Sequence, residues 1–282
     1  MNEWQLLGTA DPRHLGEARD QAHWAAQIIA AVGNTFSNHQ EDDSHTSMEW
    51  LESQRLLAGQ YTEKNPSFRL GLDIGRLTFR IIDLEDSAVA ESELVGNTLD
   101  GAYEWVESIS RMLHGSDEIE LHRPTYEMPE HPVHTGRETF SSAGRAQEFL
   151  ELEHWFSNAS LMLHRVIQDV GEASPIRCWP HHFDIAFLAY PEPGTGKSIG
   201  VGMTPGDTYY PDPYWYVTPW PYPPEDVDLP VLNGGGRWHT EGWTGSILRG
   251  TDLVLATTAA EQEQQCIDFL QSAMAACGNI LT

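Results

Sequence analysis

The sequence predicts an α+β fold with a mostly antiparallel sheet, built from two similar helix–strands–helix halves that pack as one compact unit. Long stretches with helical spacing of apolar residues are followed by groups of short stretches in which apolar and polar residues alternate. Turn residues join several of the short stretches closely, which favours antiparallel pairing. The order helix, strands, helix occurs in each half of the 282-residue chain, although no residue-level repeat accompanies it.

The first half contains the expected elements in this order: a helix over 11–32, a strand over 48–57, strands over 68–73 and 77–82, and a helix over 98–113. Asp11 and Pro12 fit a helix start, because proline is tolerated in the first turn. Gly33 followed by Asn34 fits the end of that helix. Residues 74–76 lie between two alternating stretches and indicate a hairpin. The stretch 48–57 is also compatible with a short helix.

The second half follows an irregular segment, 116–140, that is rich in proline and histidine and is the best candidate for a linker. The predicted domains are therefore an amino-terminal half over 1–115, this linker, and a carboxy-terminal half over 141–282. The elements expected in the second half are a helix over 143–170, strands over 176–190, 198–203 and 214–218, and a helix over 258–276.

The composition excludes several partners. Acidic residues outnumber basic ones by 42 to 16, for a net charge of −26, whereas nucleic acids and anionic membranes need a basic footprint. The cysteines, Cys178, Cys266 and Cys277, are widely spaced and form neither a disulfide framework nor a CxxC metal site. No leader pattern or long apolar span is visible. We expect a cytoplasmic protein without nucleic-acid or membrane partners; a homo-oligomer stays open.

One glycine-rich stretch imitates a phosphate-binding loop. Residues 194–198 read Gly-Thr-Gly-Lys-Ser, but the glycine that such a loop requires four residues before the Gly-Lys-Ser is replaced by Pro191. The following residues alternate like a strand instead of beginning a helix. We therefore expect a turn between two strands here.

The stretch 177–188 holds the first candidate catalytic pair. If it is one strand, alternate residues share a face, and the apolar face that packs on the core holds Trp179, His181, Phe183, Ile185 and Phe187. His182 and Asp184 then point together into a polar site, as a base with an orienting carboxylate or as two metal ligands. A structural hydrogen bond between strands is the alternative. Pro180 could bulge the strand and shift this phase.

An aromatic segment over 202–222 follows. Its Pro-Gly turn would present Asp207 at a loop tip. Strand alternation places Tyr214 and Tyr216 on one face and Trp215 on the other. Such aromatics form the wall of a pocket for a flat or sugar-like ligand, or simply pack an irregular loop.

A glycine-rich stretch over 234–245 surrounds Arg237, Trp238, His239, Glu241 and Trp243. Glycines allow the backbone to approach a ligand closely, and loops often hold functional residues. A flexible connector is the alternative, but two tryptophans are unusual in a solvated linker.

Four of these stretches resemble a bacterial family of uncharacterised proteins. The resemblance covers most of the chain and is carried by the stretches WPHHFDIA (179–186), GVGMTPGD (200–207) with PYWYVTPWPYP (213–223), WHTEGW (238–243) and DDSHTSMEW (42–50). It implies no activity. It points to the same side chains, His182, Asp184, Asp207 and His239, and adds His45.

Together these patterns predict a small-molecule binding protein or enzyme with its site within 176–245, and the chemistry of an enzyme here would be metal-assisted or acid–base. The catalytic candidates are His182, Asp184, Asp207, His239 and Glu241. The ligand-binding candidates are Tyr214, Tyr216, Trp238, Trp243 and Arg237. A divalent metal ion would take His182, Asp184 and His239. Two alternatives remain: a carbohydrate or aromatic-ligand binding module without catalysis, and an oligomerising interaction protein with its aromatic segment buried in the contact.

Overall fold

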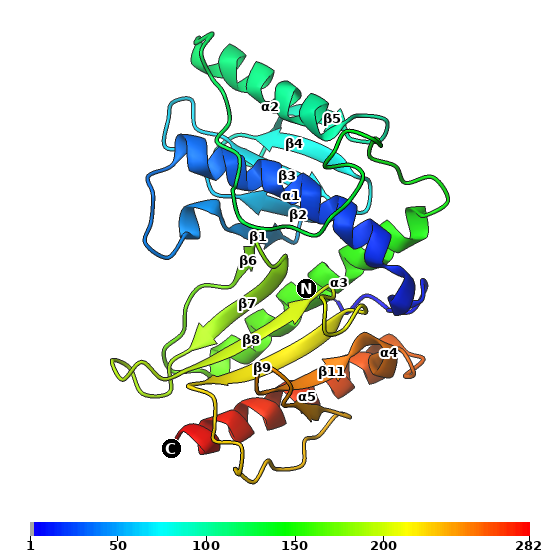
Figure 1. Cartoon of the computed structure of the whole chain (residues 1–282), viewed down its shortest axis with the longest axis vertical. Coiled ribbons are helices and arrows are strands. Elements are labelled where there is room, and N and C mark those ends of the chain that lie inside the picture. The colour runs from blue at the N-terminus through cyan, green and yellow to red at the C-terminus, as the bar shows by residue number, and fades with distance from the viewer. Residues whose placement is uncertain (1–2) are drawn as a thin grey trace. The chain divides into compact units, whose positions relative to one another are not determined.

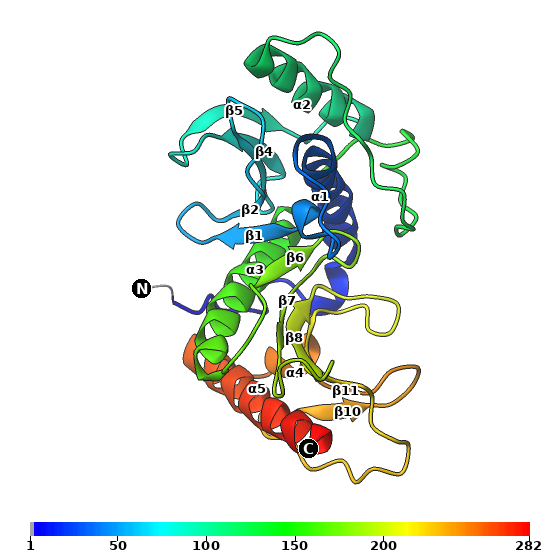
Figure 2. The same ribbon diagram turned by 90° about the vertical axis from the view of Figure 1, so that its left-hand side faces the viewer.

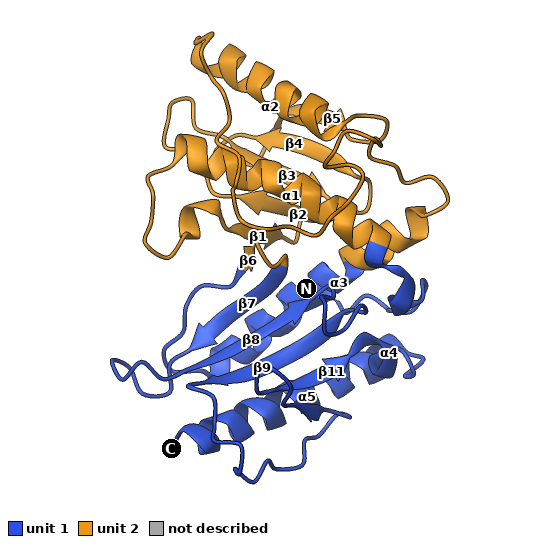
Figure 3. Ribbon diagram, viewed as in Figure 1, with its two compact units in different colours: residues 1–16, 154–177, 184–282 blue, residues 17–153, 178–183 orange. Residues whose placement is uncertain are grey.

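Helices and antiparallel strands build both parts of the chain, as the computed structural model of residues 3–282 shows (Figures 1 and 2). The predicted α+β class with an antiparallel sheet is confirmed. The chain divides into two compact units, coloured in Figure 3. Unit 1 holds residues up to 16, 154–177 and 184–282, and unit 2 holds 17–153 and 178–183. Among residues 3–282, no helix is both long and apolar enough to cross a bilayer.

The strands of unit 2 are β1 (Met48–Leu51), β2 (Leu56–Gly59), β3 (Arg69–Asp73), β4 (Thr78–Ile82), β5 (Ala88–Glu93) and the end of β6 (Arg177–Trp179). They lie in the order β6-β1-β2-β3-β4-β5, and every pair is antiparallel. The predicted hairpin is β3 and β4, closed at the pair Asp73 and Thr78. The single strand expected over 48–57 is instead a hairpin of two strands, with Arg55 at a positive φ of 51° in its turn.

Helix α1 (Gly16–Phe36) is buried along nearly its whole length in unit 2. One side of α1 packs on the sheet so closely that a Cβ added to Gly59 would lie 2.6 Å from the side chain of Ile29. The irregular segment 116–140 covers another side, and Trp24 Nε1 donates to Pro129 O at 3.1 Å. The predicted helix end at Gly33 was wrong, since α1 continues to Phe36. A Cβ on Gly33 would lie 2.2 Å from His45 O, so this glycine serves a close approach of backbones.

The segment 116–140 has no helix or strand but contributes to the core of unit 2. Its apolar side chains Ile119, Leu121, Val133 and Phe140 are buried. Helix α2 (Leu99–His114) precedes it, capped by Thr98 and ended by Gly115 in the left-handed conformation, close to the predicted range of 98–113.

Unit 1 contains β7 (Asp184–Ala189), β8 (Ser198–Thr204), β9 (Tyr214–Trp220), β10 (Arg237–His239) and β11 (Gly245–Arg249). They are antiparallel and lie in the order β10-β11-β9-β8-β7. The Gly-Thr-Gly-Lys-Ser stretch is the predicted turn between β7 and β8, and Lys197 Nζ pairs with Glu192 Oε2 at 3.0 Å within it. Strands β10 and β11 occupy the stretch that we expected to be a glycine-rich loop.

Helix α5 (Ala259–Leu281) packs on one face of this sheet, behind β8, β9 and β11 in Figure 1. A capping box formed by Thr258 and Glu261 begins it. Trp215 and Val217 are fully buried, and Cys277 of α5 lies against Val217 O. Helix α3 (Ala146–Val166) begins in unit 2, and its Trp155 belongs to unit 1. The short helix α4 (Gly250–Leu253) follows β11, and its Gly250 lies close to the ring of Trp155. The opposite face of the sheet is the one that carries polar side chains.

Candidate functional site

The face of the unit 1 sheet opposite α5 gathers most of the predicted residues, and we call it the tyrosine face. It comprises Asp184, Tyr214, Tyr216 and His239 from the strands, with Asp207 and Tyr210 from the β8–β9 loop. The predicted alternation in β9 is confirmed, because Trp215 is fully buried toward α5 while both flanking tyrosines face the other way. Strand alternation therefore brings side chains that are distant in sequence into one polar layer.

Tyr216 reaches across one strand to bind the carboxylate of Asp184. Its hydroxyl donates to Asp184 Oδ2 on β7, although β8 lies between β7 and β9. The strand pairing puts Gly202 of β8 directly beside Tyr216, where a Cβ would lie 2.6 Å from the tyrosine Oη. The ring can lie over β8 only because Gly202 has no side chain.

Gly202→Ala is expected to destabilise the protein by about 1–2 kcal/mol, the usual range for overpacking a filled site. The added methyl would meet both Tyr216 and the Cβ of Ala186, at 2.7 Å, so the tyrosine must leave Asp184. Urea unfolding followed by fluorescence measures the change. Gly171→Ala is the control, because a Cβ there meets nothing within 4 Å. Equal stability of the two variants would contradict the assigned role of Gly202.

Asp207 organises the β8–β9 loop, as its position at a turn tip suggested. Its Oδ1 accepts from the backbone N–H groups of Tyr209 and Tyr210 at 2.8 and 2.9 Å. Its Oδ2 accepts from the hydroxyl of Tyr214 at 2.8 Å. Burial, and secondly the charge of Asp207, raise the pKa of Tyr214 far above its ordinary value. Tyr214 therefore stays protonated and acts as a hydrogen-bond donor.

His239 is held at both ring nitrogens. Nε2 lies 2.7 Å from the backbone carbonyl of Glu241, which can only accept, so this nitrogen carries the proton. Nδ1 then accepts from the hydroxyl of Tyr210 at 2.8 Å. The ring of Trp243 covers the imidazole, with centroids 4.3 Å apart. A metal ion could bind His239 only by displacing one of these partners, and Glu241 contributes its carbonyl to this arrangement.

Several predicted residues lie apart from this group. Trp238 points to the other side of β10 and donates to Pro230 O at 2.8 Å, whereas Arg237 alternates onto the same side as His239 but pairs with Asp252 at 3.2 Å. Asp184 and His239 lie on β7 and β10 with three strands between them. Neighbouring strands are about 4.8 Å apart, which separates this pair by roughly 19 Å. The structure therefore does not bring Asp184 and His239 together around one ion.

The stretch 176–190 is not one strand, and this corrects the predicted environment of His181. A turn over 180–183 separates β6 from β7, with Phe183 at a positive φ of 57° and its N–H bound to Trp179 O at 2.7 Å. His181 is exposed instead of buried, and His182 is exposed beside it, with ring centroids 4.3 Å apart. Phe183 is buried as expected, stacked on His23. Both histidines belong to unit 2 and Asp184 to unit 1.

The sequence analysis missed a buried ion pair beside the tyrosine face. Asp212 is fully buried and accepts from the guanidinium of Arg249 and from Thr251, at 3.2 Å for the N–H and 3.0 Å for the hydroxyl. The arginine also lies over the ring of Tyr210 at 5.3 Å. Asp212 stands between two prolines in an aromatic segment, which gave no sign of a charged core residue.

Two cavities are lined by residues outside the tyrosine face. One of about 700 Å³ in unit 1 is lined by residues of 6–13 and 251–257, and its charged pair, Asp11 and Arg13, is self-satisfied and exposed. One of about 340 Å³ in unit 2 lies between α1, α2 and the 123–134 segment, with Trp24 and Tyr103 among its walls. Neither holds a residue predicted for the site. Among residues 3–282, the group of histidine and carboxylate side chains with metal-ligand proximity is His39, Asp43 and His45 of unit 2.

Comparison with known proteins gives no assignment. No family model, no curated protein and no solved structure matches the chain.

Proposed function

We propose that the tyrosine face of unit 1 binds a flat, hydroxyl-rich small molecule of the neutral-sugar class. The observation that carries this proposal is that two aromatic rings lie across glycines of this sheet face, one of them held by a hydrogen bond to Asp184. Tyr216 lies over Gly202, and Trp243 lies over Gly245, where a Cβ would come 2.5 Å from the indole. Both rings are half-buried, and the part of each that remains accessible is suited to stacking on a sugar ring.

Exposed aromatics extend this face along β9. Trp220 ends the strand on the same side as Tyr216 and is 55% exposed, while Tyr222 just beyond it is 45% exposed. Their rings meet edge to face with centroids 5.3 Å apart. Gly200 lies next to Thr218 on the neighbouring strand and presents no side chain. This end of the face thus offers a large apolar surface with little to cover it.

The polar groups of the face suit a ligand that donates hydrogen bonds. The hydroxyls of Tyr214 and Tyr216 donate to Asp207 and Asp184, which leaves the tyrosine oxygens able to accept. A net charge of −26 disfavours anionic ligands over the whole surface. A neutral polyol satisfies both conditions.

Binding is tested with a panel of neutral hexasaccharides, cellohexaose and maltohexaose among them, by calorimetry and saturation-transfer NMR. We expect one of them to bind and Trp220→Ala to weaken it at least about tenfold, since loss of an aromatic anchor commonly costs 1–2 kcal/mol or more. Leu255→Ala is the control, because Leu255 is exposed on unit 1 away from this face. No binding by any neutral sugar at millimolar concentration, or equal binding by both variants, would refute the proposal.

Acid–base catalysis is a second candidate, favoured by one pair of side chains. The unprotonated Nδ1 of His239 accepts from Tyr210, so it can take the tyrosine proton while Glu241 O holds the other side of the ring. Tyr210 would then exchange protons with a ligand, and His239 would act as its positioning residue. Once a ligand is found, Tyr210→Phe separates the two candidates: lost turnover with retained binding supports catalysis, and unchanged chemistry removes it.

A further inference from the structure

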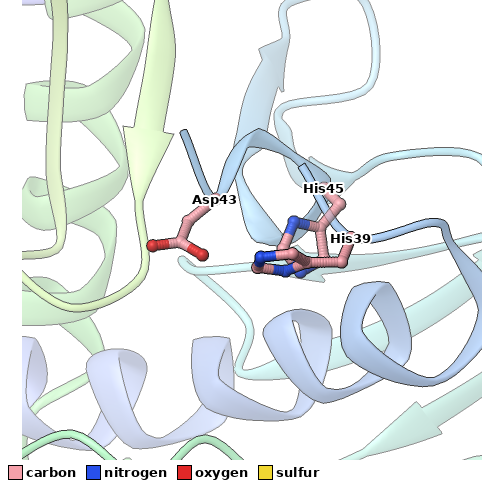
Figure 4. A group of neighbouring side chains, drawn as sticks. All are labelled: His39, Asp43 and His45. Carbon is pink, nitrogen blue, oxygen red and sulfur yellow. The ribbon is translucent and has the colours of Figure 1, made fainter. Parts of the chain in front are cut away.

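The loop between α1 and β1 in unit 2 brings two histidines and a carboxylate together. One ligand atom from each of His39, Asp43 and His45 lies within 4.8 Å of the others (Figure 4). The ring nitrogens lie on the side that faces the carboxylate. We infer that this loop binds a divalent transition-metal ion, such as zinc or cobalt, through these three side chains. The inference is independent of the ligand proposed for unit 1.

The spacing of the three groups is close to what an ion requires. Ligand atoms about 2.1 Å from one ion lie roughly 3.4 Å from one another in a tetrahedral site. Bringing the ligand atoms from 4.8 Å to this separation requires each to move by about 1 Å, which exposed side chains do by small rotations. His39 and Asp43 are exposed and can move, whereas His45 is buried and fixes the position of the site.

The backbone holds His45 and Asp43 in place. Gly33 of α1 lies against the carbonyl of His45, so the helix supports the residue from beneath. Asp43 adopts the left-handed conformation, with φ 55°, which aspartate and asparagine tolerate better than most residues. The N–H of Thr46 donates to Asp43 O at 3.0 Å and closes the turn. A rigid loop of seven residues therefore supplies every ligand, and little chain entropy is lost on binding.

One existing hydrogen bond must change when the ion binds. The backbone N–H of Gln40 donates to His45 Nδ1 at 3.2 Å. An ion bound to Nδ1 would take the place of the Gln40 N–H. An ion bound to Nε2 would keep the ring proton on Nδ1, so Nδ1 could no longer accept the hydrogen bond from Gln40. Either way the contact with Gln40 is given up. The 3.2 Å distance marks a weak bond, whose loss costs little compared with metal coordination.

The donor set indicates the class of metal. Two imidazoles and one carboxylate suit zinc, cobalt, nickel or iron(II) better than calcium or magnesium, which prefer oxygen ligands. Three protein ligands leave further positions for water or a substrate, as in catalytic metal sites. The three cysteines are buried, and none of them belongs to this group.

The pairing of β1 with β6 adds two more histidines to this region. Met48 pairs with Cys178 in antiparallel register, so residues before β1 lie at the same end as residues after β6. The turn with His181 and His182 therefore emerges beside the 39–45 loop.

The test uses untagged full-length protein, stripped with a chelator and titrated with Co²⁺ or Zn²⁺ alone. We expect near-stoichiometric binding by calorimetry and a cobalt absorption band of nitrogen and oxygen ligation. His39→Ala and Asp43→Asn are expected to weaken binding by at least about tenfold. Asparagine keeps the left-handed turn, so a folding defect is not expected in that variant. His14→Ala, which removes an exposed histidine of unit 1, is the control.

Each outcome of this titration either supports or overturns the proposed metal site. Loss in both loop variants with normal binding by His14→Ala supports the site, and circular dichroism confirms that the variants are folded. Equal binding by all variants would show adventitious binding to scattered histidines and would overturn it. Absence of binding at about 100 μM metal would overturn it as well, because structural and catalytic sites bind far more tightly.

Discussion

Arg249→Met is expected to destabilise the protein by about 3 kcal/mol, near the lower end of the range for breaking a buried ion pair. Asp212 is 0% exposed, and the substitution leaves its carboxylate with Thr251 as its remaining partner among the hydrogen bonds described above. The arginine side chain is 27% exposed and contributes packing as well, through its stem and its contact with Tyr210. Methionine preserves much of the stem, so the loss measured is chiefly that of the charge and its hydrogen bonds. Urea unfolding at neutral pH gives the free energy of unfolding.

Arg237→Met provides the matched comparison for this prediction. It makes the same substitution on the neighbouring strand β10, where Arg237 pairs with Asp252 and both side chains are substantially exposed, at 47% and 39%. Exposed pairs contribute about 0–1 kcal/mol because water screens them. A loss for Arg249→Met no larger than that for Arg237→Met would mean that Asp212 is solvated after the substitution, and would contradict the assignment of a buried, structural pair.

The sequence was a good guide where two signals agreed. In β9 the alternation of Tyr214, Trp215 and Tyr216 matched both strand period and burial, and the structure has the predicted faces. The hairpin β3–β4 and the helix expected over 98–113 were predicted for the same reason, since boundary residues and apolar period coincide there. Local sequence signals are sufficient to specify such elements without long-range contacts.

The sequence was a poor guide where tertiary contacts decide. Pro180 begins a turn because its carbonyl is bound by His23 Nε2 at 2.7 Å and by Gln27 Nε2 at 2.8 Å, both from α1. Burial lowers the pKa of His23 to about 4, so it stays neutral and serves this structural bond. No pattern around Pro180 encodes a partner more than 150 residues away. The strand phase, and with it the predicted burial of His181, failed for that reason.

The proposed metal-binding loop was not predictable from the sequence either, because its geometry depends on the fold. His39, Asp43 and His45 lie within seven residues, a spacing that resembles no specific metal motif. Only the turn at Asp43 and the support from α1 bring their ligand atoms together. Of the three, His45 was singled out through the family resemblance alone, and its two partners became visible only in the folded chain.

Gly33→Ala is expected to destabilise the protein by about 2 kcal/mol, although alanine is the better helix former. In a helix interior the change from glycine to alanine contributes about 1 kcal/mol of stability. Against this, the new Cβ would lie 2.2 Å from His45 O and 3.1 Å from the Cα of Thr46, both backbone atoms that cannot rotate away. Overpacking costs of up to about 3 kcal/mol or more apply when backbone must move, so the clash outweighs the propensity. The displaced segment carries His45, and metal affinity should therefore fall together with stability.

Gly278→Ala in α5 separates the two effects, because a Cβ there meets nothing within 4 Å. Helix propensity is then the only effect, so the free energy of unfolding of this variant should rise by up to about 1 kcal/mol. The gain is smaller than in a helix interior because Gly278 lies near the end of α5. Opposite signs for the two glycines, measured by the same urea titration, would establish that Gly33 is kept for contact with the loop. If Gly33→Ala proved as stable as Gly278→Ala and bound cobalt normally, the loop would be free to shift away from α1. His45 would then not be the fixed point of the site, and the three ligands would have to be brought together by the ion itself.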